Sequence, residues 1–195
     1  MPEIKINPDD YFTFKFQEGK IAYTAGEESA FVIPAEALSE FANLLEREPS
    51  NVLYTLGLCV GRHFGRSLSA MYGDQGLDAD ASPEDFLNNI NGILSLHGYG
   101  LVSLETWGDV LLFEWETVVD DRPLAVHFQE GVLCGILRVF TGRDFEVSAM
   151  GNFSKGPGKY CAGNYKMIQW VKELIKKGVV EGEIVSRLNR GEHLK

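Results

Sequence analysis

The stretch from Val126 to Val147, VHFQEGVLCGILRVFTGRDFEV, constrains the fold of this chain more than any other part of the sequence. Its apolar residues recur at spacings of three and four, which predicts a helix with one face in a core. Gly131 and Gly135 share one side of that helix, and each costs about 1 kcal/mol of helix propensity relative to Ala. Close packing of another backbone would offset this cost. The helix should end near Thr141, because Gly142 can adopt the left-handed conformation that closes a helix.

A second predicted helix carries a matching series of glycines. The segment from Ser50 to Tyr72 has helical apolar spacing, with Ser50 in the position of an N-cap. Gly57, Gly61 and Gly65 follow at intervals of four and leave a smooth groove along one side. We expect this groove to contact another helix or a sheet. Because the groove and the apolar helix faces exceed what one small sheet needs to cover, a homodimer is also predicted.

The remainder of the chain is predicted to alternate between strands and helices. Period-two spacing places Phe12, Phe14 and Phe16 on one face of an N-terminal hairpin. The Gly-rich segment at 151–165 is predicted to be an irregular loop. The other expected elements are helices at 34–48, 83–97, 164–177 and 183–188, an acidic loop at 73–83, a hairpin of strands at 99–106 and 109–118, and a strand at 145–150.

Composition excludes several classes of partner. The formal net charge of -10 argues against nucleic acid or an anionic membrane surface, since both require clustered Lys and Arg. No apolar run approaches the roughly 20 residues that span a bilayer. The three cysteines, Cys59, Cys134 and Cys161, are widely separated, and the charged start has no signal-peptide pattern. A cytoplasmic protein is therefore expected.

Motifs for catalysis are lacking in this sequence. None of the four histidines lies in a nucleophile, metalloprotease or deaminase motif, and no dinucleotide-binding signature follows a strand. His97 ends a predicted helix, where the helix dipole favours its charged form, and we prefer this interpretation to a haem ligand. His63 beside Arg62 and Arg66 is interpreted as a solvated basic face in preference to an anion site. We expect a protein that is not an enzyme, although the sequence leaves that question open.

The order of these elements resembles that of a known family. The turn HGYG at 97–100 and the pattern FxxGxLxGxLxxxxGxxxxV at 128–147 are similar to the 4-vinyl-reductase domain, a relative of the core subunits of the TRAPP tethering complex and, more distantly, of haem nitric-oxide-binding domains. The resemblance covers roughly 52–161 and implies an α/β (α+β) fold with an antiparallel sheet packed against several helices. It divides the chain into an N-terminal hairpin and helix (1–50), a core (51–163) and a C-terminal helical extension (164–195), packed as one globular unit. The matching positions are Gly57, Gly61, Gly98, Gly100, Phe128, Gly131, Leu133, Gly135, Leu137, Gly142, Val147 and Cys161.

The resemblance also implies three functions. Similar domains bind small molecules or hydrocarbons as sensors, assist tetrapyrrole pathways, or form dimeric scaffolds. We predict a non-catalytic binding domain for a hydrophobic small molecule, in a sensory or accessory role. The alternatives are a homodimeric scaffold for a protein partner, as in TRAPP core subunits, and a tetrapyrrole vinyl reductase or its accessory. The ligand would lie between helices and sheet, against residues that are equally the expected core: Phe64, Leu68, Trp107, Phe113, Trp115, Phe128 and Val132.

Metal binding is implied only for some members of that family. In the zinc-containing members, an acidic residue at the last strand and closely spaced cysteines bind the metal. Glu146 and Cys161 fill two such positions here, but Ala149 and Met150 stand where another cysteine would be expected. Because a closed zinc site takes four ligands, no metal and no other cofactor are expected.

Overall fold

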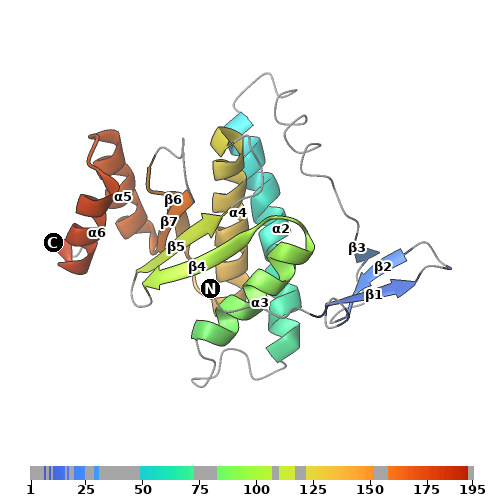
Figure 1. Cartoon of the computed structure of the whole chain (residues 1–195). Coiled ribbons are helices and arrows are strands. Elements are labelled where there is room, and N and C mark those ends of the chain that lie inside the picture. The colour runs from blue at the N-terminus through green and yellow to red at the C-terminus, as the bar shows by residue number, and fades with distance from the viewer. Residues whose placement is uncertain are drawn as a thin grey trace.

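The larger sheet of the protein has four antiparallel strands. In the computed structural model its strand order is β4 (Leu101–Thr106), β5 (Leu111–Glu116), β7 (Gly158–Gly163) and β6 (Glu146–Ala149) (Figure 1). Neighbouring strands are antiparallel throughout, so the predicted antiparallel sheet with helices is confirmed. The structure describes residues 7, 9, 11–15, 17, 20–24, 29–30, 49–72, 83–106, 110–116, 122–151 and 158–192.

Helices cover both faces of this sheet. On one side lie α2 (Pro49–Tyr72), α3 (Pro83–Leu96) and α4 (Arg122–Thr141), and on the other lie α5 (Tyr165–Lys176) and α6 (Glu181–Asn189) (Figure 1). Successive side chains of a strand therefore point to opposite faces of the sheet. On β5 the side chain of Phe113 lies in the core between the sheet and α2, α3 and α4, which we term the first core. The side chain of its neighbour Leu112 lies in the core between the sheet and α5 and α6, which we term the second core. Because helices cover both faces, apolar side chains of the central strands point to both sides of the sheet.

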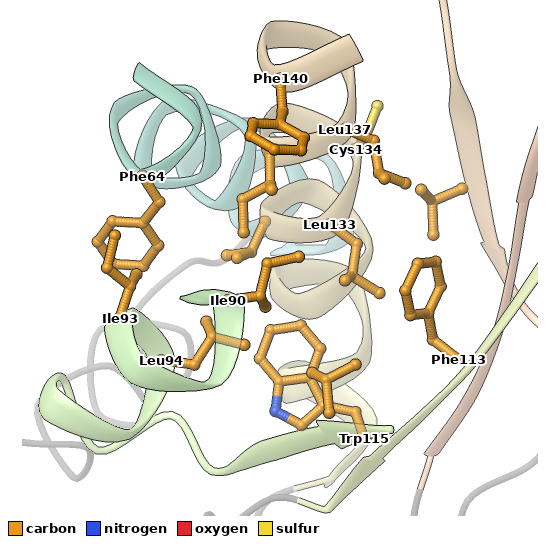
Figure 2. Packing of buried hydrophobic residues seen from close by; sticks show 14 of the residues in the cluster. Phe64, Ile90, Ile93, Leu94, Phe113, Trp115, Leu133, Cys134, Leu137 and Phe140 are labelled. Carbon is orange, nitrogen blue, oxygen red and sulfur yellow. The ribbon is translucent and has the colours of Figure 1, made fainter. Parts of the chain in front are cut away.

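The first core contains the residues that were predicted to line a ligand pocket. Figure 2 shows Phe113 and Trp115 projecting from β5 toward α4, with Phe64 entering from α2. Trp107 lies outside the described residues. The other predicted residues all belong to this core and none is more than 7% exposed: Phe64, Leu68, Phe113, Trp115, Phe128 and Val132.

The glycines of α2 and α4 bring the two helix backbones together. A Cβ atom at Gly57 or Gly61 would fall within 3.0 Å of the α4 backbone at Phe128 or Val132. On α4, a Cβ at Gly135 would lie 2.6 Å from the carbonyl oxygen of Leu58. The predicted helix contact is therefore confirmed. The groove is filled by α4 of the same chain, so it is not an exposed surface that calls for a second copy, and the homodimer stays a prediction without this support.

Two of the secondary-structure predictions are wrong. The segment predicted to be an irregular loop contains β7, which pairs with both β5 and β6. Its core residues Tyr160, Cys161 and Ala162 are all buried because β7 is covered on both faces, so the alternation that marks a strand is absent. Ser50 is not an N-cap either, because α2 begins at Pro49 and Ser50 lies inside its first turn.

The remaining predicted elements agree with the structure wherever it describes them. Helix α4 ends at Thr141, and Gly142 follows with φ of +63°. The N-terminal hairpin is formed by β1 (Phe12–Lys15) and β2 (Lys20–Tyr23), which β3 (Ser29–Ala30) extends to a small sheet. The helix predicted at 34–48, residues 73–82 of the predicted acidic loop and Phe16 lie outside the described residues, and Pro83, predicted to end that loop, begins α3.

Candidate functional site

Five aromatic rings meet at the end of α3 and form what we term the His97 cluster. The imidazole of His97 lies 4.6 Å from the ring of Phe64, 5.3 Å from Phe12 and 6.0 Å from Tyr99, measured between ring centroids. Tyr99 in turn lies 5.4 Å from Phe128. The rings come from β1, α2, α4 and the α3–β4 turn, so segments far apart in the sequence build this cluster.

His97 is neutral in this environment. Its Nδ1 lies 2.8 Å from the carbonyl oxygen of Ile93 and donates a hydrogen bond to it. Burial lowers the pKa of His97 below the ordinary value of 6.5, and this desolvation outweighs the hydrogen bond to Ile93. The prediction that the helix dipole favours the charged form of His97 is therefore wrong. The cluster consists of apolar rings around one uncharged polar group.

The N-terminal hairpin covers the His97 cluster. The hydroxyl of Tyr11 lies 3.5 Å from Oδ1 of Asn89 on α3. That hydroxyl also occupies the space that a side chain at Gly92 would need. This contact docks β1 on α3 and positions Phe12, which is 8% exposed, over His97, while Phe14 on the same strand is 41% exposed.

The structure divides the predicted pocket residues into two groups. Phe64 and Phe128 belong to the His97 cluster. Leu68, Phe113, Trp115 and Val132 fill the core between helices and sheet, where the indole nitrogen of Trp115 donates to the carbonyl oxygen of Tyr99 at 2.7 Å. Sequence reasoning missed Phe12, His97 and Tyr99 as partners of one site. The signal for them was the HGYG turn, which was used only as a family marker.

A second candidate site is a polar pocket of about 520 Å³ between α2, α4, β6 and α5, which we term the β6-edge pocket. This volume is in the range of small-molecule sites, but the lining is mostly polar. Sequence reasoning did not anticipate it. Its lining residues are Ser50, Asn51, Tyr54, Leu58, His127, Glu130, Arg138, Glu146, Val147 and Lys172.

Side chains of α4 replace a neighbouring strand along the open edge of β6. Glu130, Cys134 and Arg138 follow at intervals of four and therefore share one face of the helix. Glu130 accepts a hydrogen bond from the backbone N–H of Ala149 at 2.7 Å. Arg138 Nε donates to the carbonyl oxygen of Phe145 at 2.7 Å, and the thiol of Cys134 donates to the same oxygen at 3.3 Å. These bonds satisfy edge groups that would otherwise be open to another strand.

Three ion pairs lie around the β6-edge pocket. Arg138 lies 2.6 Å from Glu146 and 3.3 Å from Asp144, which does not line the pocket, and His127 lies 3.0 Å from Glu130. The hydrogen bond to Glu130 raises the pKa of His127 above 6.5. Tyr54 donates to Cys134 at 3.4 Å, and burial raises the pKa of both groups. Both stay protonated at neutral pH, so neither is an activated nucleophile.

Glu146 and Cys161, the two residues considered as metal ligands, have separate environments. The carboxylate of Glu146 is paired with Arg138. Cys161 is fully buried in the second core, where burial raises the pKa of its thiol to about 12. Within the described residues no group of three or more His, Cys, Asp or Glu side chains is placed to hold a metal ion. These two residues therefore offer no ready ligand pair.

Comparison with known proteins finds similarity in structure alone. No family model and no curated protein matches the sequence. The chain is similar to the crystal structure of the phenol-responsive sensory domain of the transcription activator PoxR with phenol, at a TM-score of 0.64 and 14% identity over 87% of this chain and 91% of that one. A weaker similarity, with a TM-score of 0.45 and 12% identity over 66% of this chain and 91% of that one, is to a trafficking protein particle complex subunit 3 from Naegleria fowleri covalently bound to palmitic acid. The first similarity shows that the chain has the fold of that sensory domain.

None of the helices in the described part of the chain is both long and apolar enough to cross a membrane.

Proposed function

We propose that this chain is a non-catalytic binding domain for a hydrophobic small molecule with an aromatic ring, in a sensory or accessory role. The observation that carries the proposal is the His97 cluster, in which the rings of Phe12, Phe64 and Tyr99 contact one imidazole, and Phe128 contacts Tyr99. Such a group of side chains suits a ligand that is mostly apolar and has one polar substituent. The fold shared with a phenol-responsive sensory domain supports the same class of ligand.

The expected mode of binding follows from the rings themselves. A one-ring ligand that buries about 150 Å² of apolar surface gains roughly 4 kcal/mol from the hydrophobic effect. Phe64 and Phe128 would contact its ring, and His97 and Tyr99 would orient its polar substituent. Because Phe12 covers His97 from the hairpin, ligand entry requires β1 to move away from α3.

Enzymatic chemistry receives no support from the buried nucleophiles. Burial raises the pKa of Cys134 and of Cys161, so both thiols are neutral and poorly reactive at neutral pH. The pKa of Tyr99, inside the His97 cluster, is raised by burial as well. Tyr99 can therefore donate a hydrogen bond to the proposed ligand, and the unprotonated Nε2 of neutral His97 can accept one, but neither group is poised to attack it.

Native mass spectrometry and solvent extraction of freshly purified protein test this proposal. We expect an apolar or aromatic molecule bound at about one per chain. The informative variants are Phe128→Leu and Phe140→Leu, because both side chains lie on α4 and are 7% exposed, but Phe140 stacks on Phe86 away from His97. Phe128→Leu should alter what is bound, and Phe140→Leu should not. Protein that is empty, does not bind phenols or longer hydrocarbons, and recovers a defined protein partner in a pull-down would favour the scaffold alternative.

A further inference from the structure

The β6-edge pocket contains one cation, Lys172, that is paired with no side chain of the described residues. Lys172 lines the pocket from α5 and forms no hydrogen bond or ion pair with any residue in the described part of the chain. It faces His127, which acts as a second cation when protonated, and the two repel each other. Glu130 already pairs with His127, so Lys172 is the cation of this pocket that an added anion would pair with.

Backbone groups add further donors to the same pocket. Met150 N–H bonds to the Lys159 carbonyl on β7, so alternate residues of β6 direct their backbone groups to the open edge. Phe145 and Ala149 are bonded there by α4 side chains, but none of those side chains bonds Val147, which lines the pocket between them. The first turn of α2, with its partial positive charge, closes another side.

We propose that the β6-edge pocket binds a small monocarboxylate, held between Lys172, His127 and the Val147 backbone N–H. This site is separate from the His97 cluster, and its ligand is different in chemistry, so the inference does not depend on the proposed function.

The charges of the lining select a monoanion. Lys172, Arg138 and protonated His127 are the cations, and Glu130 and Glu146 are the anions, which leaves an excess of one positive charge. Both carboxylates are already bonded, Glu130 to His127 and Ala149, and Glu146 to Arg138. A single carboxylate neutralises the excess, whereas a phosphate dianion would bring uncompensated charge next to Glu130 and Glu146.

Titration calorimetry with acetate, benzoate and inorganic phosphate, on the full chain at constant ionic strength, tests the inference. We expect saturable binding of a carboxylate probe that weakens about tenfold or more in Lys172→Met, as the loss of a charge-assisted hydrogen bond requires. Lys166→Met is the matched control, because Lys166 lies exposed on the same helix and does not line the pocket; its affinity should equal that of the parent chain.

Three results would overturn the proposal. They are the absence of binding for both carboxylates, equal affinities of the Lys172→Met and parent chains, and tighter binding of phosphate than of either carboxylate. The affinity for the carboxylate should also fall as pH rises through the pKa of His127, and this fall should be absent in His127→Gln. The charged side chains that line the pocket with His127 are Glu130, Lys172, Arg138 and Glu146. A fall that persists in His127→Gln would remove His127 from the site.

Discussion

At the scale of single residues, His97 and His127 illustrate how opposite environments act on one side chain. His97 is half-buried among rings, and this desolvation lowers its pKa, whereas the hydrogen bond that His127 donates to Glu130 raises the pKa of His127. We predict that an NMR titration of the imidazole signals places His97 below 6.5 and His127 above it. Glu130→Gln should move the pKa of His127 down and leave His97 unchanged. Two imidazoles that both titrate near 6.5 would contradict the described environments.

The same two shifts predict opposite effects on stability. The lowered pKa of His97 means that the unfolded chain binds its proton more readily, so the folded state loses stability as pH falls below 6.5. The raised pKa of His127 stabilises the folded state below 6.5, and this contribution disappears as pH rises through its folded pKa. Urea unfolding should therefore show His127→Gln to be less stable than the parent chain at about pH 5.5 and equal to it at about pH 9. The opposite order would show that the Glu130 contact does not form.

At the scale of elements, the packing of α2 on α4 depends on glycines at the contact. A Cβ at Gly57 would meet the backbone carbonyl of Phe128, which cannot rotate away as a flexible side chain does. We predict that Gly57→Ala destabilises the fold by about 3 kcal/mol, measured by urea unfolding. Gly182→Ala on α6 is the control, because nothing lies within 4 Å of its Cβ, and helix propensity should stabilise that variant by about 1 kcal/mol. Equal effects at the two positions would contradict the close contact.

Lys159 joins α6 to the sheet. Its ammonium group lies 2.8 Å from Glu105 on β4, 3.1 Å from Glu114 on β5 and 3.2 Å from Glu181 at the start of α6. These carboxylates raise the pKa of Lys159, so it stays charged at neutral pH. Lys159→Met should cost about 2 kcal/mol of unfolding free energy, because it removes three contacts and leaves like charges facing one another. Hydrogen exchange should show the loss first in α6, and unchanged protection there would refute this role.

Among the helices and strands, some features could be predicted from the sequence and others could not. The spacing of Gly57, Gly61, Gly131 and Gly135 predicted close backbone contact, because such contact requires only the absence of side chains on one helix face. It could not identify the partner, since α4 and a second copy of the chain present the same requirement. Strand β7 was missed because burial on both faces removes alternation.

The two candidate sites could not be predicted from the sequence, because both depend on how distant elements pack together. Glu130, Cys134 and Arg138 read as part of a helix surface, and their bonds to β6 depend on a strand order that places β6 at the edge of the sheet. The helix dipole led to the prediction that His97 is charged, because the sequence does not reveal that the rings of Phe12 and Phe64 pack against its imidazole.

At the scale of the whole molecule, the homodimer predicted from the sequence requires a surface other than the glycine groove. Within the described residues, the large apolar side chains that remain exposed are Phe14, Val52, Tyr165 and Val180. They come from β1, α2, α5 and the turn before α6. Light scattering at micromolar concentration should still give a dimer mass if the prediction holds, and a monomer mass would contradict it.

Over 87% of its length the chain shares the fold of a phenol-responsive sensory domain, and we propose that an aromatic ligand binds in the His97 cluster. The direct measurement is a phenol titration followed by NMR of the aromatic side chains. We predict saturable shifts at His97, Tyr99 and Phe128, weakened by Phe12→Leu and unaffected by Phe14→Leu, since the buried ring of Phe12 lies 5.3 Å from the imidazole and Phe14 is 41% exposed. Shifts that do not saturate, that occur away from the His97 cluster, or that change equally in the two variants would contradict the binding of an aromatic ligand in this cluster.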